Sequence, residues 1–236
     1  NKIRQVTSVL SESISNDDKL KNIRSLLNDE DVLREFFLNL KDSSLISVLY
    51  TNGYFDNPPL SIGTPNGGVR YISWPQSKYL TRMAEHAPVI VADIYENIKT
   101  DNPSINCDIV DAAMEMPVEV AVSLVPNICR AAQNYALWIS FENACDFCVR
   151  LSESEYLNEA VQLAISLFKP KQKEKDTPTH QLDEYWYKKG MEKVVPVLAA
   201  RNAKEFLPEL CRWLKSLIDI EKHVDSGSDD DDSCFW

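Results

Sequence analysis

The chain has 236 residues, a formal net charge of −11 and 44% hydrophobic residues, which fits one large or two small domains with a hydrophobic core. Its acidic balance disfavours nucleic acid and anionic membranes as partners, because both attract basic surfaces. Glycine occurs only 6 times among long runs of helix-forming residues, and few segments alternate apolar and polar residues. The composition therefore predicts an all-α protein.

The sequence also bears on the compartment of the protein. No apolar run approaches the roughly 18 residues of a membrane-spanning helix, and the first residues lack the apolar core of a signal peptide. Six cysteines are spread through a chain too large to need disulfide staples, so we expect reduced thiols and a cytoplasmic protein. Because the chain begins with Asn rather than Met, we expect it to be part of a larger protein.

Residues 1–50 predict helical hairpins. The first helix is expected to run to Ser15 and Asn16, because four apolar residues share one helical face: Ile3, Val6, Leu10 and Ile14. Asn16 or Asp17 is the expected cap of a second helix. Asp29 or Asp31 is the expected cap of a third helix, and a short apolar helical turn follows it.

Residues 51–74, which we call the arm, break the helical pattern. They contain Asn57-Pro58-Pro59 and Pro65-Asn66-Gly67-Gly68, a density of turn residues that excludes a helix. Residues 60–62 and 69–72 flank the Asn-Gly-Gly turn, which predicts either a long loop or a small β-hairpin. Connections between helices are usually about 2 to 8 residues long, so a segment of this length calls for an explanation.

The arm carries the candidate partner-binding residues Tyr54, Arg70, Tyr71 and Trp74. One interpretation is structural, with the aromatic residues, Phe55 among them, docking onto the helices and pinning the arm. The other is functional, with Arg70, Tyr71 and Trp74 forming part of a surface for a ligand or protein, since such residue types are enriched at binding hot spots.

Residues 75–168 predict a central stack of helices. Pro75, Pro88 and Pro103 each suit the first turn of a helix, where a missing N–H costs nothing. The helix after Pro103 has a buried stripe made of Ile105, Ile109, Ala112, Ala113 and Met116. Pro117 starts a further helix, expected to be continuous from Val118 to Ala132.

From Ser152 to the C-terminus we expect one more helix of the stack, a linker, a helix pair and a tail. Ser152 or Ser154 is expected to cap the helix that ends at Phe168, with Glu155 completing a capping box. Residues 169–181 form a charged, proline-bounded linker. Residues 182–224 predict a C-terminal helix pair, and residues 225–236 an acidic tail that buries nothing.

The sequence contains no recognised catalytic, nucleotide-binding or metal-binding motif, and it predicts no cofactor. Cys145 and Cys148 form a Cys-x-x-Cys pair, but no second pair lies at zinc-site spacing. At this spacing the two cysteines share one helical face, so we expect no metal there. The three histidines lie far apart, and no two carboxylates are spaced as an acid/base pair.

Consecutive amphipathic helix pairs, joined by Asp101-Asn102-Pro103 and with prolines at or near helix starts, resemble HEAT and armadillo α-solenoids. The resemblance covers residues 74–168 and is closest from Ile90 to Met116. The arm and the missing fixed repeat period depart from that family, so an irregular α-α superhelix is the alternative fold. The proline-rich arm that leads into Trp74-Pro75 is also similar to helical regions of large bacterial multidomain proteins.

These features support two functions of different classes. The first is a non-catalytic helical interaction or scaffold module that binds a protein partner or a neighbouring domain through a groove or through the arm. The second is an enzyme or small-molecule sensor with a pocket between the arm and the helices. A deep pocket with converging polar groups near the arm would favour the second function, and a shallow, elongated face the first.

Overall fold

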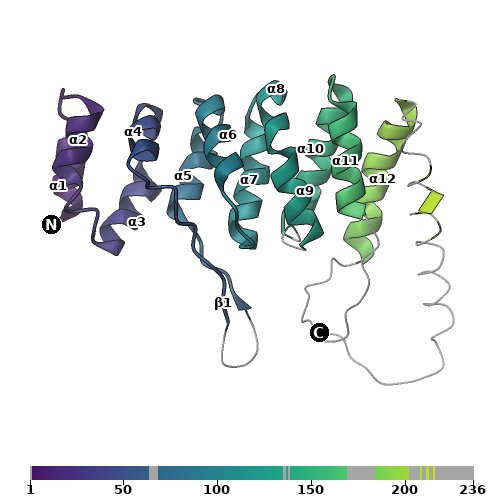
Figure 1. Cartoon of the computed structure of the whole chain (residues 1–236), viewed down its shortest axis with the longest axis horizontal. Coiled ribbons are helices and arrows are strands. Elements are labelled where there is room, and N and C mark those ends of the chain that lie inside the picture. Colours follow the sequence, from purple (N-terminus) through teal and green to yellow (C-terminus); the bar gives the residue numbers. More distant parts are fainter. Residues whose placement is uncertain are drawn as a thin grey trace.

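The fold was analysed in a computed structural model that describes residues 2–63, 69–134, 137, 139–168 and 184–201, together with 208, 211, 212 and 215. These residues are mostly helical, which confirms the all-α prediction. The helices lie side by side in one long row that runs from α1 to α12 (Figure 1). Within the described part of the chain, no helix combines the length and the apolarity needed to cross a membrane.

The N-terminal elements are α1 (Lys2–Leu10), α2 (Asn16–Ile23), α3 (Glu30–Asn39), the 3-10 turn η1 (Ser43–Leu45) and α4 (Ile46–Thr51). The prediction that the first helix reaches Asn16 was wrong. The Ser15 hydroxyl accepts a hydrogen bond from the Asp18 N–H and caps α2, so the chain has already left the first helix. Asp29 caps α3 in the same way through the Val32 N–H, as the sequence predicts.

Three helices begin at a proline: α5 (Pro75–Met83), α6 (Pro88–Asn97) and α7 (Pro103–Glu115). All three starts were predicted, because proline lacks the N–H that a first turn leaves unpaired. The predicted continuous helix from Val118 to Ala132 is instead broken into α8 (Val118–Ala121), the 3-10 turn η2 (Val122–Leu124) and α9 (Val125–Gln133). Pro126 explains the break, since its ring disfavours the preceding helical turn.

The last described helices are α10 (Phe141–Glu153), α11 (Leu157–Phe168) and α12 (Glu184–Ala200). Ser152 does not cap α11, because it lies inside α10 and its hydroxyl donates to the Val149 carbonyl. The predicted linker at 169–181 and the tail at 225–236 lie outside the described residues. The first helix of the predicted C-terminal pair is α12, and most of the second lies outside the described residues as well.

Two sets of helices share the hydrophobic core. In one set, α3, α5, α7, α10 and α12 contact one another in succession; in the other, α2, α4, α6, α8 with η2 and α9, and α11 do the same. The largest fully buried side chains are Tyr79, Tyr95, Phe37, Phe147 and Phe168. The apolar stripe predicted for α7 is buried along its whole length, and this helix lies at the centre of the core.

Arginine side chains satisfy carbonyl groups that helix ends leave free. Arg82 of α5 donates to carbonyls at the end of α3, and its shorter bond, to the Phe37 oxygen, is 2.6 Å. Arg150 of α10 donates to carbonyls at the end of α7, and Arg201 reaches the Glu153 carbonyl at the end of α10 at 2.8 Å. Each of these bonds joins two helices that are neighbours within one set.

The central position of α7 can be tested with Ile109→Ala. Ile109 is 1% exposed, so its truncation removes buried methyl groups and leaves a cavity. The free energy of unfolding should fall by about 2 to 5 kcal/mol in a denaturant titration. Val89→Ala on α6 is the matched control; this side chain is 71% exposed, and its truncation should cost less than about 0.5 kcal/mol. Equal losses in the two variants would contradict the assigned core.

Candidate functional site

The arm ends in a small β-hairpin at one long edge of the helical row (Figure 1). Strands β1 (Ile62–Gly63) and β2 (Val69–Arg70) pair antiparallel, with Ile62 opposite Arg70. Side chains that are opposite each other, or two residues apart, point to the same face of a hairpin. Ile62 and Arg70 therefore share one face of the hairpin. Together with Leu60, which precedes β1 by two residues, they make up what we call the hairpin face.

Two aromatic residues anchor the base of the arm in the helical core. Phe55 is 2% exposed and its ring lies 5.9 Å from that of Phe37, and Trp74 is 4% exposed. The sequence predicted that both would dock, because a long arm with aromatic residues at its ends needs somewhere to bury them. Trp74 is therefore part of the anchor and contributes no surface to a partner.

Asn102 holds the two segments that flank the hairpin strands from the N-terminus of α7. Its side-chain Nδ2 donates to the Pro59 carbonyl at 3.1 Å and to the Ile72 carbonyl at 2.8 Å, which are the two sides of the hairpin stem. Its Oδ1 accepts from the Ser104 N–H at 3.1 Å and so caps α7. A single buried amide thus caps a helix and clamps the arm.

The clamp was missed in the sequence, although its signal was present. The Asn102-Pro103 pair predicted a helix start, and that role accounts for only one end of the amide. The donors at the other end are free to bond elsewhere, and no local pattern identifies which carbonyls they reach. The partners lie 43 and 30 residues away along the chain.

The remaining candidate residues differ in their exposure. Arg70 is exposed and Tyr71 is half-buried, while Tyr54 is half-buried with its ring 6.2 Å from that of Phe37. Burial also raises the pKa of the Tyr54 hydroxyl. The structure thus brings Arg70 and Tyr71 together on the arm and places Tyr54 at its base against α3.

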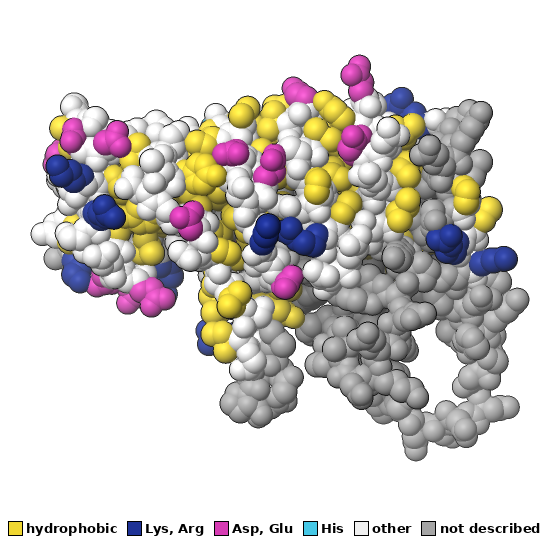
Figure 2. Space-filling view, viewed as in Figure 1, with side chains coloured by type: hydrophobic (Ala, Val, Ile, Leu, Met, Phe, Trp, Pro, Cys, Tyr) yellow, Lys and Arg dark blue, Asp and Glu magenta, His cyan; other side chains and the backbone are white. Residues whose placement is uncertain are grey.

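Sequence reasoning missed the exposed apolar residues of the arm. Leu60 is 77% exposed and Ile62 is 52% exposed. Figure 2 shows hydrophobic side chains gathered on the arm where it projects from the row. The alternation Leu60-Ser61-Ile62 could have signalled a strand with one apolar face, but it gave no reason to expect that face to be uncovered.

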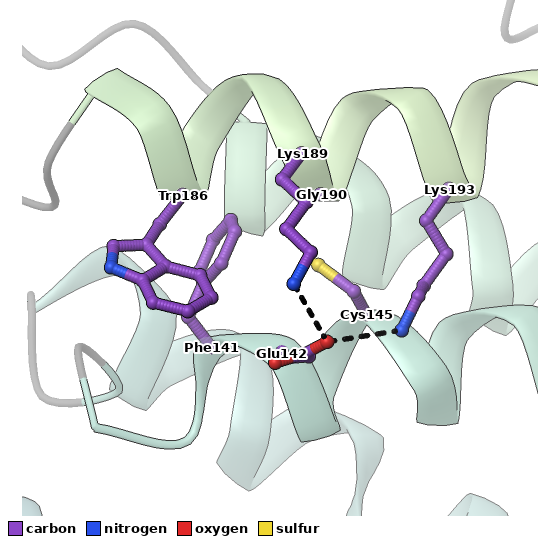
Figure 3. A pocket seen from close by; sticks show the side chains of 7 residues that line it. All are labelled: Phe141, Glu142, Cys145, Trp186, Lys189, Gly190 and Lys193. Atoms are coloured by element: carbon purple, nitrogen blue, oxygen red, sulfur yellow. Dashed lines mark hydrogen bonds and ion pairs between the residues drawn. The ribbon is translucent and has the colours of Figure 1, made fainter.

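A small hollow lies between α10 and α12 (Figure 3). Its volume of about 10 Å³ is close to the space of a single water molecule. Lys193 spans it with an Nζ 2.6 Å from Asp146 and 3.7 Å from Glu142, and Trp186 stacks with Lys189 at 4.9 Å from the ring centre. This hollow is a packing seam between two helices.

A second hollow is an open depression at the start of α6, which we call the α6 depression. It has a volume of about 580 Å³, and its lining is apolar except for one carboxylate: Ala87, Pro88, Val89, Ile90 and Asp93. Neither of these two hollows lies between the arm and the helices, which is where the alternative interpretation placed a ligand.

A polar cluster joins α5, α6 and α7 inside the core. Asp108 is fully buried and pairs with Lys78, while the Tyr95 hydroxyl bonds to Ser77 and lies 3.1 Å from the Thr81 hydroxyl. Burial raises the pKa of Asp108, and the Lys78 ammonium partly offsets this. The residues of the cluster line neither of these two hollows, and they join α5, α6 and α7 to one another.

Cys145 and Cys148 share one face of α10 as their spacing predicts, and this face is buried in the core. Burial raises the pKa of Cys145 to about 12, and the Cys148 thiol donates to the Ala160 carbonyl at 3.1 Å. Both are therefore protonated at neutral pH and are poor nucleophiles. In the described ranges, no three His, Cys, Asp or Glu side chains converge in a way that could hold a metal ion.

Comparisons with protein-family models, with curated proteins and with solved structures gave no match for this chain. The function is therefore argued from the geometry of its own residues.

The clamp can be tested by comparing Asn102→Ser with Asn102→Ala. Serine keeps a cap for α7 but is too short to reach the arm carbonyls, whereas alanine loses both roles. Both variants should release the arm, so trypsin should cleave after Arg70 several times faster than in the parent protein. Only the alanine variant should lose a further 0.5–2 kcal/mol or so of unfolding free energy through the missing cap. Unchanged cleavage in both variants would show that the arm does not depend on Asn102.

The close approach of α10 and α12 can be tested with Gly190→Ala. In an open helix this change stabilises by about 1 kcal/mol, but a Cβ on Gly190 would lie 2.6 Å from a ring carbon of Phe141 and 2.9 Å from the Cys145 sulfur. Overpacking should reverse the sign and destabilise the protein by about 1 to 3 kcal/mol in thermal or denaturant unfolding. Gly63→Ala, with nothing within 4 Å of the added carbon, should not unfold the stack. A stabilised Gly190→Ala protein would mean that the two helices are farther apart.

Proposed function

We propose that this chain is a non-catalytic α-helical interaction module that docks a protein partner, or a neighbouring domain of the same protein, through its arm. The observation that carries the proposal is the hairpin face, where Leu60 and Ile62 stand uncovered beside Arg70 on a segment fixed to the stack at its base. Exposed apolar side chains grouped around a cation are typical of a surface that another protein covers.

A stacked scaffold of HEAT-like antiparallel helix pairs fits the arrangement of the helices. Short turns join α5 to α6 and α6 to α7, and the two sets of helices each run through the molecule in succession. Helices that contact mainly their neighbours produce an extended surface, which suits protein binding better than it suits a closed catalytic pocket. Proline at the start of three successive helices supports the same assignment.

The anchoring of the arm supports a binding role because it reduces the entropic cost of docking. An isolated two-stranded hairpin is marginally stable in water. Here the buried side chains of Phe55 and Trp74 anchor the base of the arm in the helical core. Asn102 donates hydrogen bonds to both sides of the hairpin stem. A partner therefore meets a hairpin that is already ordered, and less of the binding energy is lost in fixing it.

The alternative of an enzyme or small-molecule sensor requires a pocket between the arm and the helices. In the described residues that space holds the buried Phe55, Trp74 and Asn102 side chains. The two hollows described above lie elsewhere. The hollow between α10 and α12 is too small for a ligand larger than water, and the α6 depression is open. This arrangement favours the interaction module.

The proposal can be tested by placing a photo-crosslinking amino acid at Ile62 and exposing extracts of the source cells to light. The arm should form one dominant crosslinked species, which should disappear when Leu60→Ser is added. The matched control places the same group at Leu38 on α3, an aliphatic position that is 45% exposed. No specific product at position 62, or the same products at both positions, would contradict binding through the arm.

A further inference from the structure

Charge is segregated around the arm in a way that the overall acidity hides. Residues 57–84 contain no Asp or Glu but include Arg70, Lys78 and Arg82. Residues 83–98, which form the next turn and α6, contain no Lys or Arg but include Glu85, Asp93 and Glu96. In a chain with 36 acidic residues, residues 57–84 are thus a basic segment followed directly by an acidic one.

The hairpin face and the α6 depression are complementary in chemistry. The first offers two exposed aliphatic side chains and the Arg70 guanidinium. The α6 depression offers an open apolar surface, with Val89 71% exposed, and the carboxylate of Asp93, which also bonds to the Tyr50 hydroxyl. In the described part of the chain neither Arg70 nor Asp93 forms an ion pair.

The two surfaces cannot meet within one copy of the chain. The arm leads into α5, and the nine residues of this helix carry the chain about 13 Å away from it before the turn at His86. Pro88 starts α6 at that far end, so the start of α6, which lines the depression, and the hairpin lie at opposite ends of α5. When two copies lie antiparallel, the hairpin of one copy is on the same side as the α6 depression of the other copy.

We infer that the occupant of the hairpin face is a second copy of this chain, with Leu60 and Ile62 packed into the α6 depression and Arg70 paired with Asp93. The inference rests on the proposed docking role of the arm and names its partner. The contact is reciprocal: each copy supplies one hairpin and one depression, so a closed dimer contains the contact twice.

The size of the contact predicts a weak, concentration-dependent assembly. A few side chains on each surface bury less than the roughly 1,200 Å² of a stable interface. Such a small contact gives a dimer that forms only as the protein concentration rises. A charge-assisted pair at its centre makes the assembly sensitive to the sign of the two charges.

The test is a charge exchange followed by light scattering over a series of protein concentrations. The parent chain should approach twice its monomer mass as concentration rises, while Arg70→Glu and Asp93→Arg should each stay monomeric. An equimolar mixture of the two variants should recover the dimer. In the mixed dimer the glutamate at position 70 of one variant meets the arginine at position 93 of the other, and the second contact is the native pair of Arg70 and Asp93. Lys41→Glu, which changes net charge as Arg70→Glu does but at an exposed loop position, should dimerise like the parent.

Each other result counts against the inference. A parent chain that stays monomeric at every concentration would overturn it, and so would a dimer that both charge variants retain. If the parent is monomeric while the crosslinker at position 62 captures a different protein, the docking role of the arm stands and only the choice of partner is wrong. If the parent chain is monomeric and the crosslinker at position 62 also captures nothing, the docking role of the arm is overturned.

Discussion

The backbone groups that helix ends leave unpaired determine how this molecule is held together. Every α-helix has carbonyls at its C-terminus and N–H groups at its N-terminus without partners in the helix, and leaving them buried and unbonded is costly. Here Arg82, Arg150 and Arg201 satisfy carbonyls of the preceding helix in their own set. In the other set, Asn127 and Arg130 of α9 do the same at the end of α6. These bonds have defined partners, so they fix the register of one helix against the next in a way that apolar packing alone does not.

The arm depends on the same requirement at the opposite helix end. Asn102 caps α7 with its oxygen, and its nitrogen then bonds the two carbonyls of the hairpin stem. Because α7 is deeply buried, with Asp108 paired to Lys78 along its side, the arm is attached to a part of the stack that lies inside the core. A two-stranded hairpin has little stability of its own, and its bonds to the buried helix hold it in place.

Much of the fold could be predicted from the sequence, because its main signals are local. Proline at the first helical turn and apolar residues at helical spacing identified α5, α6 and α7, together with the buried stripe through Ile109. Local signals failed where two of them compete. Ser152 resembles a helix cap in sequence, but the apolar face of α10 continues through it, so packing keeps it inside a helix. Pro126 was recognised as a proline within or at the start of a helix, but the apolar spacing on both sides of it is compatible with one helix, so the break was not predicted.

The candidate site was less predictable, because its properties depend on contacts between distant residues. The sequence identified the arm and its aromatic anchors, since turn residues and tryptophan are visible locally. It did not reveal which side chains would remain uncovered, and so Leu60 and Ile62 were missed while the buried Trp74 was included. The partners of Asn102 and the position of the α6 depression relative to the hairpin follow from the stacking of helices, which no single segment encodes.

We propose that the hairpin keeps a fixed orientation on the helical stack and so presents a preformed surface. Pulsed electron paramagnetic resonance tests it most directly, with one spin label at Ile62 on the arm and another at Glu96 on α6, both exposed positions, after Cys129, Cys211 and Cys234 are replaced by serine. In dilute protein we expect one narrow distribution of distances between the two labels, and we expect this distribution to broaden when Asn102 is replaced by serine. A broad distribution in the parent protein, unchanged by that substitution, would contradict it.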